Sequence, residues 1–90
     1  MLEYEITGAF NKDRKVMQKR HKEIPLLRDV MSMLIQEKPL LPKHKNHSLK
    51  GKYQGKWECH VEQDWLLIYR IDKKKRRIIF HRTGSHSDLF

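Results

Sequence analysis

The pattern of hydrophobic and polar residues in the first half of the chain predicts one strand followed by two helices. From Leu2 to Ile6, apolar and acidic residues alternate as they do in a half-buried strand. Thr7 is a suitable N-cap for a first, highly charged helix that runs to about Lys22. Pro25 fits the first turn of a second helix. The apolar side chains of this helix repeat at helical spacing: Leu26, Leu27, Val30, Met31, Leu34 and Ile35.

The second half of the chain is predicted to form strands: residues 57–62 alternate between two faces, and residues 65–71 are apolar enough to be a central strand. Pro39 and Pro42 end the second helix, and a lysine-rich polar loop follows to about Gly55. Three segments then predict an antiparallel meander with short polar connections between them: residues 57–62, 65–71 and 77–82. In the first segment the odd-numbered residues are apolar, and the even-numbered residues share the opposite face: Glu58, His60 and Glu62.

Together these elements predict a single α+β domain, residues 1–90, in the order β-α-α-β-β-β. A small antiparallel sheet packs on the two N-terminal helices, and a chain of 90 residues leaves little room for a second core. Trp57, Cys59 and Trp65 are expected in the core between the sheet and the helices. The other sheet face, which holds His60, is expected to lie open to a ligand.

The charge of the chain indicates a polyanionic partner. Twenty Lys and Arg residues against eleven Asp and Glu residues give a formal net charge of +9. Residues 43–57 contain no carboxylate, but they contain five lysines and two histidines. The single cysteine cannot form an intramolecular disulfide, and neither a signal peptide nor a membrane-spanning apolar run is present. We therefore expect a cytoplasmic protein that does not associate with a membrane.

Three of the six histidines are candidates for chemistry. His47, His60 and His86 lie in polar motifs, and an imidazole exchanges protons near neutral pH. On a basic chain, this combination predicts acid–base chemistry on RNA. The other three histidines are expected to have no catalytic role. His21 lies at the end of a helix, His44 sits in a polar loop, and His81 follows the alternation of a strand.

Several motifs, in their order and spacing, resemble the RelE/ParE-like superfamily of bacterial type II toxins, most closely the YafQ group of mRNA interferases. The resemblance covers nearly the whole chain and implies a RelE-like fold. One departure is visible, because Asn46 and Ser48 flank His47 where the family often has Asp and Pro. The motifs are Gln18-Lys19-Arg20-His21-Lys22, Pro39-Leu40-Leu41-Pro42, His47-Ser48-Leu49-Lys50-Gly51, His60-Val61-Glu62-Gln63-Asp64-Trp65 and Arg82-Thr83-Gly84-Ser85-His86-Ser87-Asp88-Leu89-Phe90.

The resemblance implies a ribosome-dependent endoribonuclease that cuts mRNA in the ribosomal A site and inhibits translation. Cleavage is expected to be a metal-independent transesterification without a cofactor. A base takes the proton of the ribose 2′-hydroxyl, and an acid protonates the 5′-oxygen leaving group. The implied partners are the ribosome, mRNA and a cognate antitoxin whose acidic segment wraps the toxin. The free toxin is expected to be a monomer.

The family motif, carried over position by position, also names site residues. The implied catalytic set is His47, His60, Asp64, His86 and Phe90. Either His86 or His60 is the general acid, either His47 or Asp64 is the base, and Phe90 is expected to stack on or orient a base. Cations that stabilise the charge developing on the phosphate are expected at four positions: Lys50, Lys52, Lys56 and Arg82.

Three other classes of function remain as alternatives. A non-catalytic basic module that binds RNA or the ribosome explains the charge, although it needs no histidines. A ParE-type toxin that inhibits gyrase shares the scaffold, but that branch does not carry this histidine set. A metal site is disfavoured because the histidines that it would use lack the paired spacing and the cysteines of structural zinc sites: His44, His47, His60 and His86.

Overall fold

The computed structural model describes residues 1–90, and the predicted elements all form in the predicted order. They are β1 (Glu3–Ile6), α1 (Gly8–Lys19), α2 (Ile24–Ile35), β3 (Trp57–Glu62), β4 (Trp65–Asp72) and β5 (Arg77–Gly84). The α+β class is confirmed. Four short elements were not predicted: the 3-10 turns η1 (Pro42–His44) and η2 (Gly51–Tyr53), strand β2 (His47–Ser48) and the C-terminal helix α3 (His86–Leu89).

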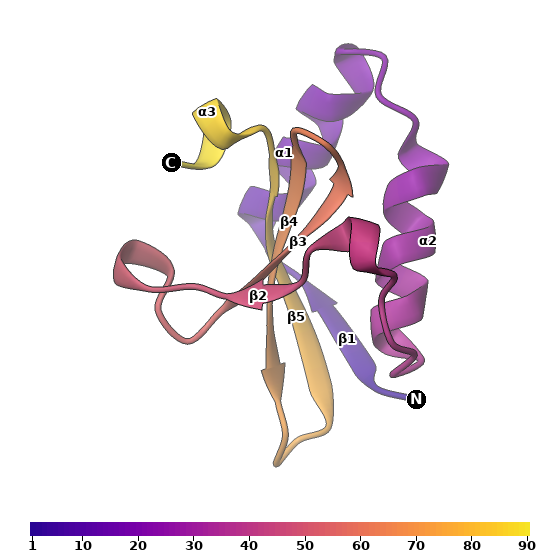
Figure 1. The fold of residues 1–90 in the computed structure, drawn as a ribbon, viewed down its shortest axis with the longest axis vertical. Coiled ribbons are helices and arrows are strands. Elements are labelled where there is room, and N and C mark those ends of the chain that lie inside the picture. The colour runs from indigo at the N-terminus through magenta and orange to yellow at the C-terminus, as the bar shows by residue number, and fades with distance from the viewer.

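The sheet has five strands in the order β1-β5-β4-β3-β2 (Figure 1). The predicted meander of β3, β4 and β5 is confirmed, and β2 adds to its edge in antiparallel register. Strand β1 instead pairs with β5 in parallel, which the order of elements alone did not predict. A parallel pair needs a long crossover connection, and α1 with α2 supplies part of it. No helix of the chain is long and apolar enough to cross a bilayer.

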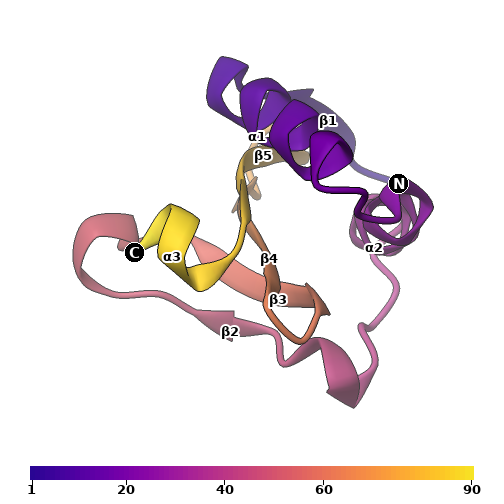
Figure 2. The ribbon, with the colours of Figure 1, turned by 90° about the horizontal axis from the view of Figure 1, so that it is seen from above.

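Helices α1 and α2 cover one face of the sheet, and the main core lies between these two layers (Figure 2). Phe10 from α1 and Leu27 from α2 pack there with Trp65 and Cys59, which were predicted as core residues. Trp57 was also predicted there, but it is 41% exposed because it begins β3 beside the two-residue edge strand β2.

Strand β1 differs from its prediction as a half-buried strand. All four of its residues, Glu3–Ile6, are exposed. The reason is its place at the edge of the sheet, where β5 is its one neighbouring strand. Leu2, just before the strand, is the residue of this segment that reaches the core.

The opposite face of the sheet is less open than predicted. Leu66 and Ile68 point to this side and form a second, smaller core with Tyr53 of η2 and Leu89 of α3. The hydroxyl of Tyr53 donates a buried hydrogen bond to the carbonyl of Leu89, at 3.0 Å. In Figure 2, α3 lies on the side of the sheet away from α2. The site described next therefore occupies only the uncovered part of this face.

Candidate active site

Six side chains form a continuous row beside the second core, and we call this set the histidine row: His47, Glu58, His60, His86, Phe90 and Tyr53. The rings of His60 and His86 have their centroids 5.9 Å apart. The rings of His86 and Phe90 follow at 6.4 Å, and Phe90 meets Tyr53 edge to face at 5.3 Å. The structure thus brings together three predicted histidines and Phe90, although they come from β2, β3 and the C-terminus.

Glu58 joins two of these histidines and was not among the predicted site residues. Its Oε1 atom lies 3.3 Å from Nε2 of His47 and 3.5 Å from Nε2 of His60. The residue is only 4% exposed, because β2 pairs with β3 and places His47 directly opposite it. The other carboxylate oxygen, Oε2, makes no hydrogen bond and is not sealed from solvent. The sequence signal was present, since Glu58 shares the even-numbered face of its strand with His60.

The second ring nitrogen of each histidine is held by a backbone carbonyl. Nδ1 of His60 lies 3.1 Å from the carbonyl oxygen of Gln63, and Nδ1 of His47 lies 3.2 Å from that of Ser48. Because a carbonyl oxygen only accepts, both Nδ1 atoms carry hydrogen in these contacts. Either Nε2 atom can donate to Glu58 only when its ring carries a second proton.

His44 was expected to be a solvated loop residue, and this expectation was wrong. It is 6% exposed, and its Nδ1 lies 2.7 Å from the backbone carbonyl oxygen of His60. Turn η1 brings it under β3, so His44 supports the strand that carries Glu58 and His60. A loop histidine gives no sequence signal of this kind, because the contact depends on how the loop folds back.

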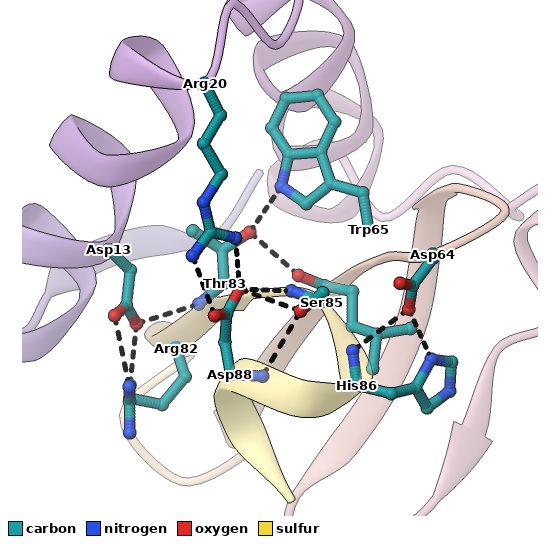
Figure 3. A network of polar contacts seen from close by, with 10 residues as sticks. Asp13, Arg20, Asp64, Trp65, Arg82, Thr83, Ser85, His86 and Asp88 are labelled. Atoms are coloured by element: carbon teal, nitrogen blue, oxygen red, sulfur yellow. Dashed lines mark hydrogen bonds and ion pairs between the residues drawn. The ribbon is translucent and has the colours of Figure 1, made fainter.

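Asp64 holds His86 through two hydrogen bonds, as Figure 3 shows. The ring Nδ1–H of His86 donates to Oδ1 of Asp64 at 2.6 Å, and the backbone N–H of His86 donates to the same oxygen at 3.0 Å. The backbone and side-chain hydrogen bonds from His86 lower the pKa of the Asp64 carboxyl. Asp64 therefore stays anionic, and Nε2 of His86 makes no hydrogen bond within the protein.

The short helix that carries His86 is fastened to α1. Arg20 donates two hydrogen bonds to Asp88, at 2.6 and 2.9 Å (Figure 3). Asp88 also forms a capping box with Ser85 at the start of α3. The hydrogen bonds from Arg20 and from the Ser85 backbone hold the pKa of Asp88 well below its usual range. Gly84 permits this close approach, since a Cβ there would lie 3.0 Å from that of Asp88.

The four predicted phosphate-binding cations do not all reach the histidine row. Lys52 does, because its Nζ lies 5.2 Å from the ring centroid of Tyr53. Lys50 is exposed and makes no ion pair or cation–π contact. Arg82 is bound by Asp13 of α1 through its Nε and Nη2 atoms, at 2.6 and 3.1 Å (Figure 3). Lys56 lies beside His81 instead, where its charge acts on that imidazole.

The two remaining histidines lie outside the row, as expected. His21 is exposed and follows the C-cap of α1 in a left-handed conformation, at φ 63°. His81 sits at the register shift between β4 and β5, and its Nε2 is buried without a partner. Burial first, and then the charge of Lys56, lower the pKa of His81. His81 is thus held as a neutral imidazole away from the site.

Comparisons with known proteins add relatives to this geometry. The family model described as "Bacterial toxin of type II toxin-antitoxin system, YafQ" matches residues 2–90. Over 87 residues the chain is 44% identical to the mRNA interferase toxin YafQ of Escherichia coli strain K12, covering 96% of this chain and 92% of that protein. A solved metal-bound toxin from Helicobacter pylori is 42% identical, with 100% of both chains covered and a TM-score of 0.93. The toxin of the E. coli DinJ–YafQ toxin–antitoxin complex is 40% identical, and the match covers 99% of this chain and 97% of that chain with a TM-score of 0.89.

Proposed function

Because the chain belongs to the YafQ family of bacterial type II toxins, we propose that it is an mRNA interferase, an endoribonuclease that inhibits translation by cutting mRNA in the ribosomal A site. One observation carries the proposal. The histidine row sets an imidazole held by a carboxylate, His86 on Asp64, beside a second carboxylate flanked by two imidazoles. This arrangement contains an acid, a base and cations for transesterification of RNA without a metal ion.

Glu58 is the base in this proposal. Its Oε2 atom is free to accept the proton of the ribose 2′-hydroxyl, whereas Oε1 faces His47 and His60. Asp64, one of the two bases considered from the sequence, is a poorer choice because its pKa is lowered and its Oδ1 already accepts two hydrogen bonds. His47, the second base considered from the sequence, is also a poorer choice, because both of its ring nitrogens face acceptor atoms of the protein.

His86 is the general acid. Asp64 fixes the proton on Nδ1 and favours the imidazolium, so Nε2 can give its proton to the 5′-oxygen. The 2′-oxygen then bonds to phosphorus as the bond from phosphorus to the 5′-oxygen breaks. The products are a 2′,3′-cyclic phosphate and a 5′-hydroxyl, and Glu58 holds the proton that it took from the 2′-hydroxyl.

The remaining members of the row position and stabilise the substrate. His47 and His60, when protonated, place positive charge beside the phosphorane, and Lys52 adds a further cation. Phe90 is 60% exposed, so its ring is available for a base to stack on, which contributes roughly 1–3 kcal/mol. Tyr53 supports Phe90 from the side.

The partners follow from the same surface and from the relatives. The net charge of +9 favours the ribosome, which presents dense phosphate. The E. coli relative is found in a complex with DinJ. We therefore propose a cognate antitoxin whose acidic segment wraps this basic chain, and a free toxin that is monomeric in the cytoplasm.

Primer extension on a defined mRNA in a purified translation reaction tests the proposal. The wild type is expected to make codon-phased cuts, which vanish when ribosomes are omitted. His86→Ala and Glu58→Gln are each expected to slow cutting by about 10²–10⁴-fold, the usual contribution of one acid–base group. His86→Ala should still fold and bind the antitoxin.

His21→Asn is the matched control, because it removes an exposed histidine outside the row and Asn tolerates the left-handed backbone there. This variant should cut like the wild type. Absence of cuts from folded wild-type protein would contradict the proposal and leave a binding module or a gyrase-directed toxin. Unchanged cutting by both His86→Ala and Glu58→Gln would remove the histidine row from the chemistry.

A further inference from the structure

Tyr69 is a buried tyrosine outside the histidine row, and its hydroxyl reaches the loop that carries His47. Its ring belongs to the main core between the sheet and the helices, and the residue is 2% exposed. The hydroxyl donates a hydrogen bond to Oδ1 of Asn46 at 2.6 Å. Burial raises the pKa of Tyr69, so the hydroxyl keeps its proton and remains a donor. Asn46, the residue next to His47, is thereby tied to β4.

Asn46 and His47 reach opposite faces of the sheet. Asn46 contacts Tyr69, whose ring lies on the face that the helices cover. His47 contacts Glu58 on the face of the histidine row. Successive side chains of an extended segment alternate in this way. A shift of the backbone at Asn46 therefore moves the ring of His47 away from Glu58, whose Oε1 lies 3.3 Å from Nε2 of that ring.

Strand β2 is too short to fix His47 alone. It has two residues at the edge of the sheet, so β3 is its one neighbouring strand. Beyond β2, the backbone N–H of Leu49 donates to the carbonyl of Lys56 at 2.9 Å. The other side of an edge strand has no backbone partner. The hydrogen bond from Tyr69 therefore adds a second attachment, to the strand in the middle of the sheet.

Lys45, on the other side of Asn46, shows how closely this segment is constrained. It adopts the left-handed conformation, at φ 44°. This conformation is unfavourable for a residue with a Cβ and persists where surrounding contacts over-determine it. The two residues that flank Lys45 supply such contacts. The Nδ1–H of His44 donates to the backbone carbonyl of His60 at 2.7 Å, and Asn46 accepts the hydrogen bond from Tyr69.

We propose that Tyr69 is a positioning residue, which acts through Asn46 to hold His47 against Glu58 from the other face of the sheet. The anchor stands on the geometry alone, whereas its effect on cleavage rests on the proposed function. The same contact assigns a role to Asn46, which stands where the family often has Asp. Either side chain offers an oxygen to the hydroxyl of Tyr69, so the departure at this position keeps the acceptor that the anchor needs.

Tyr69→Phe removes the hydroxyl and leaves the ring in the core. Because Asn46 is exposed, water can replace the lost donor, and the fold should survive. The single-turnover rate of cutting on the ribosome should fall by up to about 10²-fold, the cost that a misplacement of about 1 Å can have. The affinity for the ribosome should stay the same. Tyr4→Phe is the matched control and should cut like the wild type, because Tyr4 is 58% exposed on the edge strand β1.

Substitutions of Asn46 show whether the effect runs through this hydrogen bond. Asn46→Asp keeps an acceptor and should cut at close to the wild-type rate, whereas Asn46→Ala should be as slow as Tyr69→Phe. The double variant Tyr69→Phe/Asn46→Ala should be no slower than either single variant, since both changes remove the same contact. Wild-type cutting by Tyr69→Phe, slow cutting by Asn46→Asp, or losses that multiply in the double variant would overturn the proposal.

Amide hydrogen exchange separates an anchor from a general loss of stability, and it needs no activity. In Tyr69→Phe and in Asn46→Ala, exchange at the amide of Leu49 should speed up by a larger factor than exchange at the amides of β4 and β5. An equal increase at all of these amides, or none at Leu49, would overturn the anchor. If the wild type cuts no mRNA, the proposed function fails and the exchange result still decides the anchor, so the two failures can be distinguished.

Discussion

Among single residues, Glu58 shows why the site could be predicted only in part. The histidines could be named from motifs, because imidazoles on a basic chain already suggest proton transfer. The buried carboxylate between them depends on the pairing of β2 with β3, and a two-residue strand in a polar loop has almost no sequence signal. His44 was missed for a related reason, since its contact with the backbone of His60 exists only in the folded loop.

The Asp64–His86 pair gives a prediction at this scale. Asp64→Asn keeps the size of the side chain but removes the charge that favours the His86 imidazolium. The single-turnover rate of mRNA cutting should fall, while the affinity for the ribosome stays the same. A change in affinity with an unchanged rate would contradict the role of Asp64 as the residue that orients the acid.

Cys59 gives a second prediction. Burial between the sheet and the helices, and then the charge of Glu58, raise the pKa of this thiol to about 12. Only the thiolate reacts readily, so the folded protein at pH 8 should react with a colorimetric thiol reagent only as fast as it unfolds. Addition of denaturant should release one reactive thiol per chain. Rapid labelling of the native protein would show that Cys59 is exposed.

Among the elements, the strands were predicted almost to the residue, but the C-terminal helix was missed. The signal is strong in all three strands of the meander, because β3 alternates apolar and polar residues and the central strands β4 and β5 carry runs of buried apolar residues. Helix α3 has four residues and no room for a helical period. Its one signal is the capping box, Ser85 followed three residues later by Asp88. That helix places His86 and Phe90, so the missed element carries part of the site.

The ion pair between α1 and α3 gives a prediction at this scale. Arg20→Gln removes the Arg20–Asp88 bridge but keeps the capping box. Because α3 is then held less firmly, the rate of cutting should fall more than the affinity for RNA. Ser85→Ala removes the cap instead, at a cost of about 1 kcal/mol, and should have the same effect on the rate. A pure loss of affinity in both variants would argue against positioning of His86 by α3.

The same bridge makes stability depend on pH. The folded-state pKa of Asp88 is lowered, so its stabilising contribution is present above the ordinary value for Asp, about 3.9, and is lost as the pH falls below it. Arg20→Gln should therefore lose less stability than the wild type when the pH is lowered from about 4 to about 2. Urea unfolding at several pH values measures this difference, and parallel curves for the two proteins would contradict it.

For the whole molecule, the arrangement of helices on one face of the sheet was predicted correctly, but the openness of the second face was not. The hydrophobic pattern showed which faces the helices would cover. It did not show that Tyr53 and Leu89 fold back over Leu66 and Ile68, because those residues come from a loop and from the chain end. This second core confines the site to one end of the sheet.

The net charge gives a prediction at this scale. Affinity for a short RNA with a 2′-deoxy sugar at the cut site should fall steeply with salt, with a slope of about −0.7 for each neutralised phosphate. Lys52→Gln should reduce that slope by about this amount, because Lys52 lies at the histidine row. Lys73→Gln, in the distant β4–β5 hairpin, should leave the slope unchanged. Equal slopes for all three proteins would separate the row from RNA binding.

The most direct test of the account replaces one atom of the substrate. An mRNA with sulfur in place of the 5′-oxygen at the cut site has a leaving group that needs no protonation. With this mRNA bound to the ribosome, His86→Ala should cut at close to the wild-type rate, whereas Glu58→Gln should remain slow by about 10²–10⁴-fold. Equal rescue of both variants, or rescue of neither, would contradict the assignment of His86 as the acid and Glu58 as the base.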